Sequence, residues 1–138
     1  AVATGTTTMP IDDTIPQNDE GNEVMTLAIT PTHASNKLLI DVVVTMSNAT
    51  SGRNLEVALF QDSTAGALAS QFSYMATGGG NHIQKLTHYM TAGTTSSTTF
   101  KVRIGSGSSG TITFNGYSGA RKHGGVAASS ITISEIRV

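Results

Sequence analysis

The stretch 37-KLLIDVVVTM-46 places an apolar side chain at every second position. The alternating apolar residues are Leu38, Ile40, Val42, Val44 and Met46. A spacing of two is that of side chains on one face of a β-strand, so this stretch predicts a strand with one buried and one solvated face. The stretch 100-FKVRI-104 repeats the pattern, with two basic side chains on the outward positions.

Short runs of the same kind recur along the chain, separated by clusters of Gly, Ser, Thr, Asn and Pro. The predicted strands are residues 4–9, 23–30, 37–46, 54–61, 67–75, 82–90, 98–104, 111–115 and 129–138. No segment shows a capped helical period. This spacing of strands predicts an all-β fold, an antiparallel jelly-roll-like β-sandwich of about 8–10 strands.

The first 22 residues differ from the rest. The segment 11-IDDTIPQNDEG-21 is rich in carboxylates, follows Pro10 and contains Pro16, and a proline favours extended backbone at the residue before it. We therefore expect residues 1–22 to form an extended N-terminal arm with a first strand, and residues 23–138 to form a single sandwich domain.

Composition narrows the range of partners. The formal net charge of −1 and the scattered basic residues argue against nucleic acid. No apolar run approaches the ~20 residues needed to cross a bilayer, so no membrane insertion is expected. The absence of cysteine excludes disulfides and thiolate metal sites. Only 12% of residues are charged, and such a weakly repelling surface favours burial of part of it in a symmetric oligomer.

Catalytic and metal-binding patterns are weak. The carboxylates Asp12, Asp13, Asp19 and Glu20 lie close together, but without the spacing and glycine of a calcium loop. The four histidines are dispersed, and a chain without Trp lacks the usual sugar platform of a glycosidase. We expect no enzyme activity, no catalytic residues, no cofactor and no bound metal.

The glycine-rich stretches predict turns. Neither 78-GGG-80 nor the glycines of residues 116–125 precede a predicted helix, as a phosphate-binding loop requires. The stretch 105-GSGSSG-110 departs from the nucleophile-elbow pattern and leads into a strand, so it predicts a hairpin loop.

Recognition residues are sought among aromatic and basic side chains in and near loops. The candidate ligand-binding residues are Tyr74, His82, Tyr89, Tyr117, Arg121, Lys122 and His123. The alternative for each tyrosine is a ring packed at a strand edge. If these residues form a groove, the chain is a carbohydrate-binding module that recognises host-surface glycans through its loops.

The last predicted strand supplies candidate oligomer contacts. Ile131 and Ile133 share one parity, whereas Ile136 and Val138 have the other. Either a bulge lies near residues 134–135, or the core covers one face and a partner chain the other. We favour the second interpretation and name all four residues as interface candidates.

Four blocks together resemble a C-terminal domain of bacteriophage tail-fibre and related virion structural proteins. They are 10-PIDDTIPQNDEGNEVMTLAITPTHASNKLLID-41, 58-ALFQDSTAGALA-69, 88-HYMTAGTTSSTTFKVRIGSGSSGTITFNG-116 and 119-GARKHGGVAASSITISEI-136. The resemblance implies a non-enzymatic β-sandwich, a homotrimer, located on the virion surface with other virion proteins. Its expected role is host attachment as a tail-fibre tip or appendage, or capsid decoration that reinforces the shell.

Overall fold

The computed structural model describes residues 1–76 and 80–138, and in this part the chain forms eleven strands and one 3₁₀ turn. The strands are β1 (Ala3–Gly5), β2 (Asn22–Ile29), β3 (Lys37–Asn48), β4 (Arg53–Gln61), β5 (Ala69–Met75), β6 (Asn81–Thr91), β7 (Thr98–Ser106), β8 (Ile112–Phe114), β9 (Gly116–Tyr117), β10 (Ala120–Arg121) and β11 (Ser130–Ile136). The turn η1 is His123–Gly125. The described strand pairs are antiparallel.

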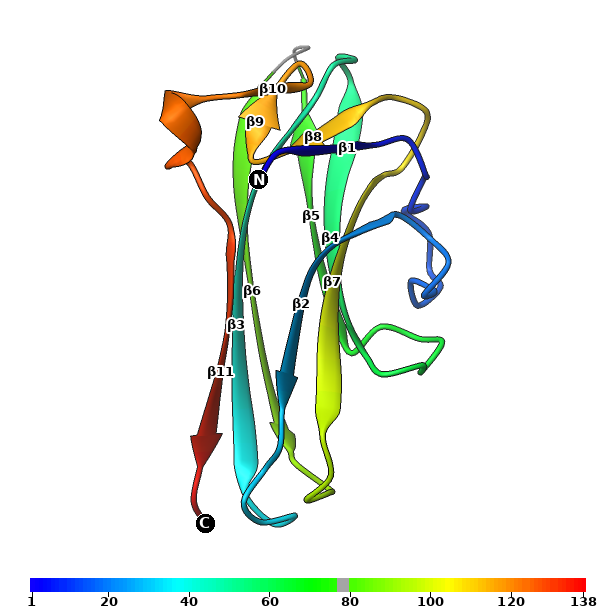
Figure 1. The fold of residues 1–138 in the computed structure, drawn as a ribbon. Coiled ribbons are helices and arrows are strands. Elements are labelled where there is room, and N and C mark those ends of the chain that lie inside the picture. The colour runs from blue at the N-terminus through cyan, green and yellow to red at the C-terminus, as the bar shows by residue number, and fades with distance from the viewer. Residues whose placement is uncertain (77–79) are drawn as a thin grey trace.

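Two sheets lie face to face as the layers of a sandwich (Figure 1). In the first, the β3 sheet, β6 pairs with one edge of β3, while β11 and β8 share the other edge and β1 lies beyond β8. The second, the β7 sheet, has the order β2-β7-β4-β5. Most successive strands change sheet, which is the jelly-roll-like arrangement. The predicted fold class is confirmed.

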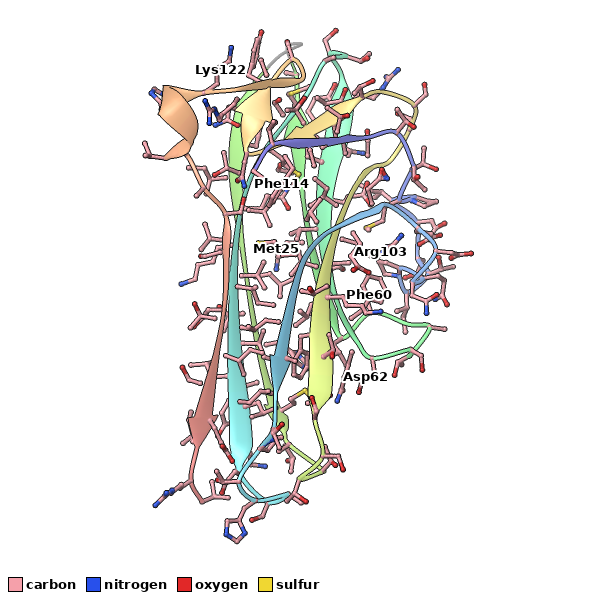
Figure 2. All side chains as sticks on the ribbon, in the orientation of Figure 1. Met25, Phe60, Asp62, Arg103, Phe114 and Lys122 are labelled. Carbon is pink, nitrogen blue, oxygen red and sulfur yellow. The ribbon has the colours of Figure 1, made fainter. Side chains whose placement is uncertain are left out.

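The core fills the space between the two sheets. It is built from the alternating inward positions of β3, β4 and β7, which are fully or almost fully buried. Figure 2 shows Met25 and Phe114 directed into this space. The aliphatic side chains identified in residues 37–46 form one wall: Leu38, Ile40, Val42, Val44 and Met46.

The N-terminal arm lies against the outer face of the β7 sheet (Figure 1). Met9 is fully buried there with Ala58 and Phe60, which point away from the main core. The Met9 amide donates to the Ser106 carbonyl at 3.0 Å. A Cβ on Gly105 would overlap Met9 Cβ and lie 3.0 Å from Met9 N, so a glycine is needed where the arm crosses β7.

Some sequence expectations need correction. The first strand was expected over residues 4–9, but β1 ends at Gly5, because the chain then turns toward the outer face and inserts Met9 there. Pairing of β11 with β3 is continuous from Ser130 to Ile136, which excludes the bulge alternative for the last strand. The glycine run 78–80 was expected to be a turn; Gly78 and Gly79 lie outside the described residues.

Candidate functional site

A compact hairpin forms part of one end of the sandwich. Strands β9 and β10 pair directly, with Ala120 opposite Tyr117 and Arg121 opposite Gly116. The turn between them places Ser118 and Gly119 in the left-handed region, with φ of 48° and 76°. The Gly119 amide donates to Thr113 Oγ1 at 2.9 Å, which ties the turn to β8.

The hairpin and η1 bring four of the seven candidate ligand residues into one segment. Lys122 Nζ lies 5.4 Å from the centroid of the Tyr117 ring, a cation–π geometry. Arg121 and His123 are exposed beside this pair in the chain. This end of the molecule, which we call the hairpin end, therefore presents a basic and aromatic surface.

The other three candidates lie elsewhere. Tyr74 is exposed on the outer face of β5, toward the hairpin end. His82 occupies an inward position of β6, where Nδ1 lies 3.4 Å from Ser73 Oγ of β5. Tyr89 lies far along β6, opposite Leu39, on the outer face of the β3 sheet. The structure does not assemble all seven residues into one groove.

The four interface candidates fall on two faces of the C-terminal segment, the odd-numbered pair on one and the even-numbered pair on the other. Ile131 and Ile133 are half-buried and pack against the main core. Ile136 and Val138 are exposed, and Ile136 lies opposite Lys37 on the outer side of β3. Only the second pair is free to contact another molecule.

The outer face of the β3 sheet carries a larger exposed surface, which we call the β3 outer face. Its most exposed apolar side chains are Ile83 and Tyr89 of β6, at 71% and 55% exposure. Leu39 and Val43 of β3 lie half-buried beside them, and Ile136 continues the face onto β11. Ile83 was not among the residues predicted from sequence, although the alternation of residues 82–90 places it on the same face as Tyr89.

Two pairs of polar side chains on the β3 outer face link β3 to β6. Asp41 accepts a 2.7 Å hydrogen bond from Thr87 Oγ1, and Lys37 Nζ donates to Thr91 Oγ1 at 2.7 Å. Lys85, opposite Val43, is a further exposed charge on this face. The face therefore combines apolar side chains with the charges of Lys37, Asp41 and Lys85.

Glu135 fixes the chain beside Ile136. Its Oε1 accepts hydrogen bonds from Asn36 Nδ2 at 2.7 Å, from the Thr32 hydroxyl and amide at 2.8 Å each, and from the His33 amide at 3.4 Å. These donors, Asn36 foremost, lower the pKa of Glu135 to about 2. The carboxylate thus anchors β11 to the turn between β2 and β3.

Two further site types were searched among residues 1–76 and 80–138. In these ranges, His, Asp and Glu side chains nowhere gather in threes that are able to hold a metal ion. Nor does this part of the chain contain a helix with the length and apolarity needed for a membrane span.

Comparison with known proteins assigns a family. Residues 6–138 match the family model described as the Pgp3 C-terminal domain. The chain belongs to the Pgp3 C-terminal domain family. The match begins at the residue after β1 and extends through the arm and both sheets. No curated protein sequence matches the chain.

Solved structures resemble this chain distantly. One is described as "EclA C-terminal domain; sugar-binding protein", with a TM-score of 0.49 and 14% identity over 97% of this chain and 77% of that chain. Another is the VP2 subviral particle of infectious bursal disease virus, with a TM-score of 0.42 and 14% identity over 100% of this chain and 38% of that one. The particle of the Gx strain of that virus has a TM-score of 0.38 and 13% identity, over 100% and 36%.

Proposed function

We propose that this chain is a non-enzymatic structural domain of a virion, which assembles as a homotrimer through the β3 outer face. The observation that carries the proposal is the exposure of Ile83 and Tyr89 on that face, flanked by Ile136. These two side chains stand about 20 Å apart along β6, by the rise of a strand, with the half-buried Leu39 and Val43 beside them. Large apolar side chains left exposed on one face of a sheet mark a candidate interaction site.

The two outer faces of the sandwich differ in a way that favours this surface. The arm covers the middle of the β7 sheet with Met9 and leaves Phe72 and Tyr74 exposed on the edge strand β5, whereas Ile83 and Tyr89 on the β3 sheet stay exposed without any such cover in the single chain. A chain with only 12% charged residues also has little surface repulsion to oppose association. A closed ring of copies buries the same face of each.

The oligomeric state is tested by multi-angle light scattering of the purified chain at micromolar concentration. The proposal expects a mass three times that of one chain, independent of salt concentration because the contact is apolar. A mass of one chain, or one that falls as salt is raised, contradicts it.

The location is a separate part of the proposal. We propose a tail-fibre tip, an appendage or a capsid decoration, acting in host attachment or shell reinforcement; the resemblance of residues 10–136 to phage virion domains supports it. Electron microscopy of virus particles from the source, labelled with an antibody to the hairpin end, tests it. Label at fibre ends, at appendages or over the shell supports the proposal, and particles without label oppose it.

The absence of catalysis is also proposed, from the dispersion of acid–base groups. His33 lies in the turn between β2 and β3, and His123 lies in η1. In the described part of the chain, His82 Nδ1 lies 3.4 Å from one hydroxyl, that of Ser73. A nucleophile and its base must lie within hydrogen-bond reach. Turnover of any chromogenic ester, glycoside or phosphate that disappears on H82A substitution would overturn this part.

Glycan binding at the hairpin end is the second candidate. The favouring observation is that Tyr74 and Tyr117 are both exposed toward this end, with Lys122 beside Tyr117. Exposed aromatic rings with neighbouring polar groups suit sugar recognition. A glycan array probed with the wild type and with Y117A distinguishes this candidate: saturable binding lost in the variant supports it, and no binding at all favours the purely structural role.

A further inference from the structure

A cavity lies between the arm and the outer face of the β7 sheet. Residues 9–12, Thr14 and Pro16 of the arm form one wall, and Glu56 with residues 70–72 forms the other. Its volume is about 140 Å³. An apolar cavity of ~150 Å³ accommodates a benzene molecule, so this one has room for the aliphatic stem and head group of a lysine-sized ligand.

Glu56 lies in the wall of this cavity with a buried carboxylate. The residue is 5% exposed, and its Oε1 has no hydrogen-bond partner among residues 1–76 and 80–138. A Cβ on Gly107 would lie 3.1 Å from this oxygen and 3.5 Å from Ile11 Cγ1, which places the oxygen between the arm and the start of the next loop. A buried carboxylate without a partner is costly to a folded protein.

The charges around Glu56 increase that cost. Asp12 lines the same cavity, and Glu20 is close enough to act on Glu56 electrostatically. Burial raises the pKa of Glu56 to about 7, and the negative charges of Glu20 and Asp12 add to the effect. No Lys or Arg is among the residues that line the cavity. The cavity therefore has a negative potential without a fixed counter-ion.

Apolar side chains supply most of the remaining wall area, beside the polar Thr14, Ser70 and Gln71. Met9, Pro10 and Pro16 come from the arm, and Phe72 lies directly opposite Glu56 in the β4–β5 pair. Phe72 is 66% exposed, so its ring is available at the rim. Aromatic faces attract cations, and apolar walls suit an alkyl chain.

We propose that this cavity binds an alkylammonium group, whose nitrogen donates to the Glu56 carboxylate while its alkyl stem contacts Met9, Pro10 and Phe72. The site is distinct from the β3 outer face, because it lies on the opposite sheet. It is independent of the proposed virion role.

A divalent metal is a poorer occupant of the same space. Calcium takes six to eight oxygen ligands, and Glu56 and Asp12 are the only carboxylates that line the cavity. The described chain contains no group of three metal-ligating side chains. The apolar majority of the walls also favours an organic cation over a hydrated ion.

The test uses NMR titration of the ¹⁵N-labelled full chain with two amines and one neutral control. The amines are n-butylammonium and a lysine capped at both backbone ends, and the control is n-butanol, which has the same length without the charge. We expect saturable shifts at the amides of Ile11, Gly107 and Phe72 with both amines, at millimolar affinity or better, as for small fragments. Tighter binding of capped lysine indicates a protein side chain as the natural ligand, and tighter binding of butylammonium indicates a free amine.

Three variants isolate the roles of the residues. Glu56→Gln removes the charge with little change in shape, and we expect affinity for both amines to fall at least about tenfold, which is ~1.4 kcal/mol. Asp13→Asn removes an equal charge from the same arm outside the cavity lining, and should leave the affinity within about twofold, since exposed charges are screened. Phe72→Leu should weaken binding to an intermediate degree, and its exposed position keeps the fold intact.

Three results would overturn the proposal: equal affinity of Glu56→Gln and wild type, n-butanol binding as tightly as the amines, or no saturable shift up to about 50 mM amine, beyond the weak end of specific affinities. Spectra of each variant without ligand confirm that it is folded. Loss of oligomerisation in the light-scattering experiment would not affect this outcome.

Discussion

The side chain of Asn36 donates a 2.7 Å hydrogen bond from Nδ2 to Oε1 of Glu135, joining residues 99 positions apart in the chain. Asn36 is buried in the turn that precedes β3, and Glu135 lies near the end of β11. Because β11 is an edge strand beside β3, this contact holds the far end of the strand in register.

Glu135→Gln should therefore lower the free energy of unfolding at neutral pH. An ionised carboxylate accepts all four hydrogen bonds, whereas an amide oxygen accepts them less strongly. Since the pKa of Glu135 is lowered to about 2, the stabilisation is present above its unfolded value of 4.5 and is lost as pH falls from 4.5 toward 2. Urea unfolding at several pH values measures this.

The matched control is Glu23→Gln. Glu23 forms an exposed 3.7 Å ion pair with Arg103, and surface pairs contribute only ~0–1 kcal/mol. If Glu135→Gln costs no more than this control, or if its cost persists unchanged at pH 2, the anchoring role is wrong.

Gly105→Ala should displace the arm from the β7 sheet. The added methyl group would overlap Met9, so either the arm lifts or β7 shifts, at a typical cost of about 1–3 kcal/mol. Hydrogen exchange of the Met9 amide, which donates to Ser106, should accelerate. Gly66→Ala is the control, because its nearest neighbour is a side-chain methyl of Ile15 at 3.3 Å, and exchange at Met9 should remain slow.

Glu56 should make the protein less stable as pH rises from 5 to 8. Its pKa is raised from 4.5 to about 7 in the fold, so the unfavourable contribution begins above 4.5, grows through 7 and is constant beyond. Its size is on the order of a few kcal/mol. Glu56→Gln should remove most of the slope in thermal unfolding curves across this range. An unchanged slope in the variant would mean that another group causes it.

Ile83→Glu on the β3 outer face should dissociate the proposed trimer without unfolding the chain. Ile83 is 71% exposed in the single chain, so a charged side chain there costs the monomer little but is buried in the assembly. Light scattering should show a smaller mass, and circular dichroism an unchanged β spectrum. Tyr74→Glu, also exposed but on the other sheet, should keep the trimer mass. Equal masses for both variants would place the contact elsewhere.

Strands with strict alternation were predictable from sequence. β3, β4 and β7 occur at nearly the expected bounds because their inward side chains, such as Val42, Leu59 and Val102, are selected by burial in one core. β9 and β10 were not predicted, since two residues are too few to show a period. Their hairpin depends instead on left-handed residues such as Ser118.

The cavity was not predictable, because it depends on contacts between distant segments. Glu56 alternates with Leu55 and Val57 as an ordinary outward residue of a strand. Only the packing of Met9 on Phe60, 51 positions away in sequence, covers that outward face, and no local pattern encodes it. By contrast, the alternation that places Ile83 and Tyr89 on the same face of β6 could be read from the sequence.

The arm makes the two broad faces of the sandwich different. The β3 outer face is the front, and the outer face of the β7 sheet, on which the arm lies, is the back. A sandwich with an interaction surface on both broad faces can add copies without limit and form stacks or sheets. Here Met9 covers the middle of the back and leaves Phe72 and Tyr74 exposed at its edge, so the proposed association through the front leaves a partly covered back on the outside of a closed set of copies. The same short segment that stabilises one chain thereby reduces the apolar area that the proposed assembly leaves open to further copies.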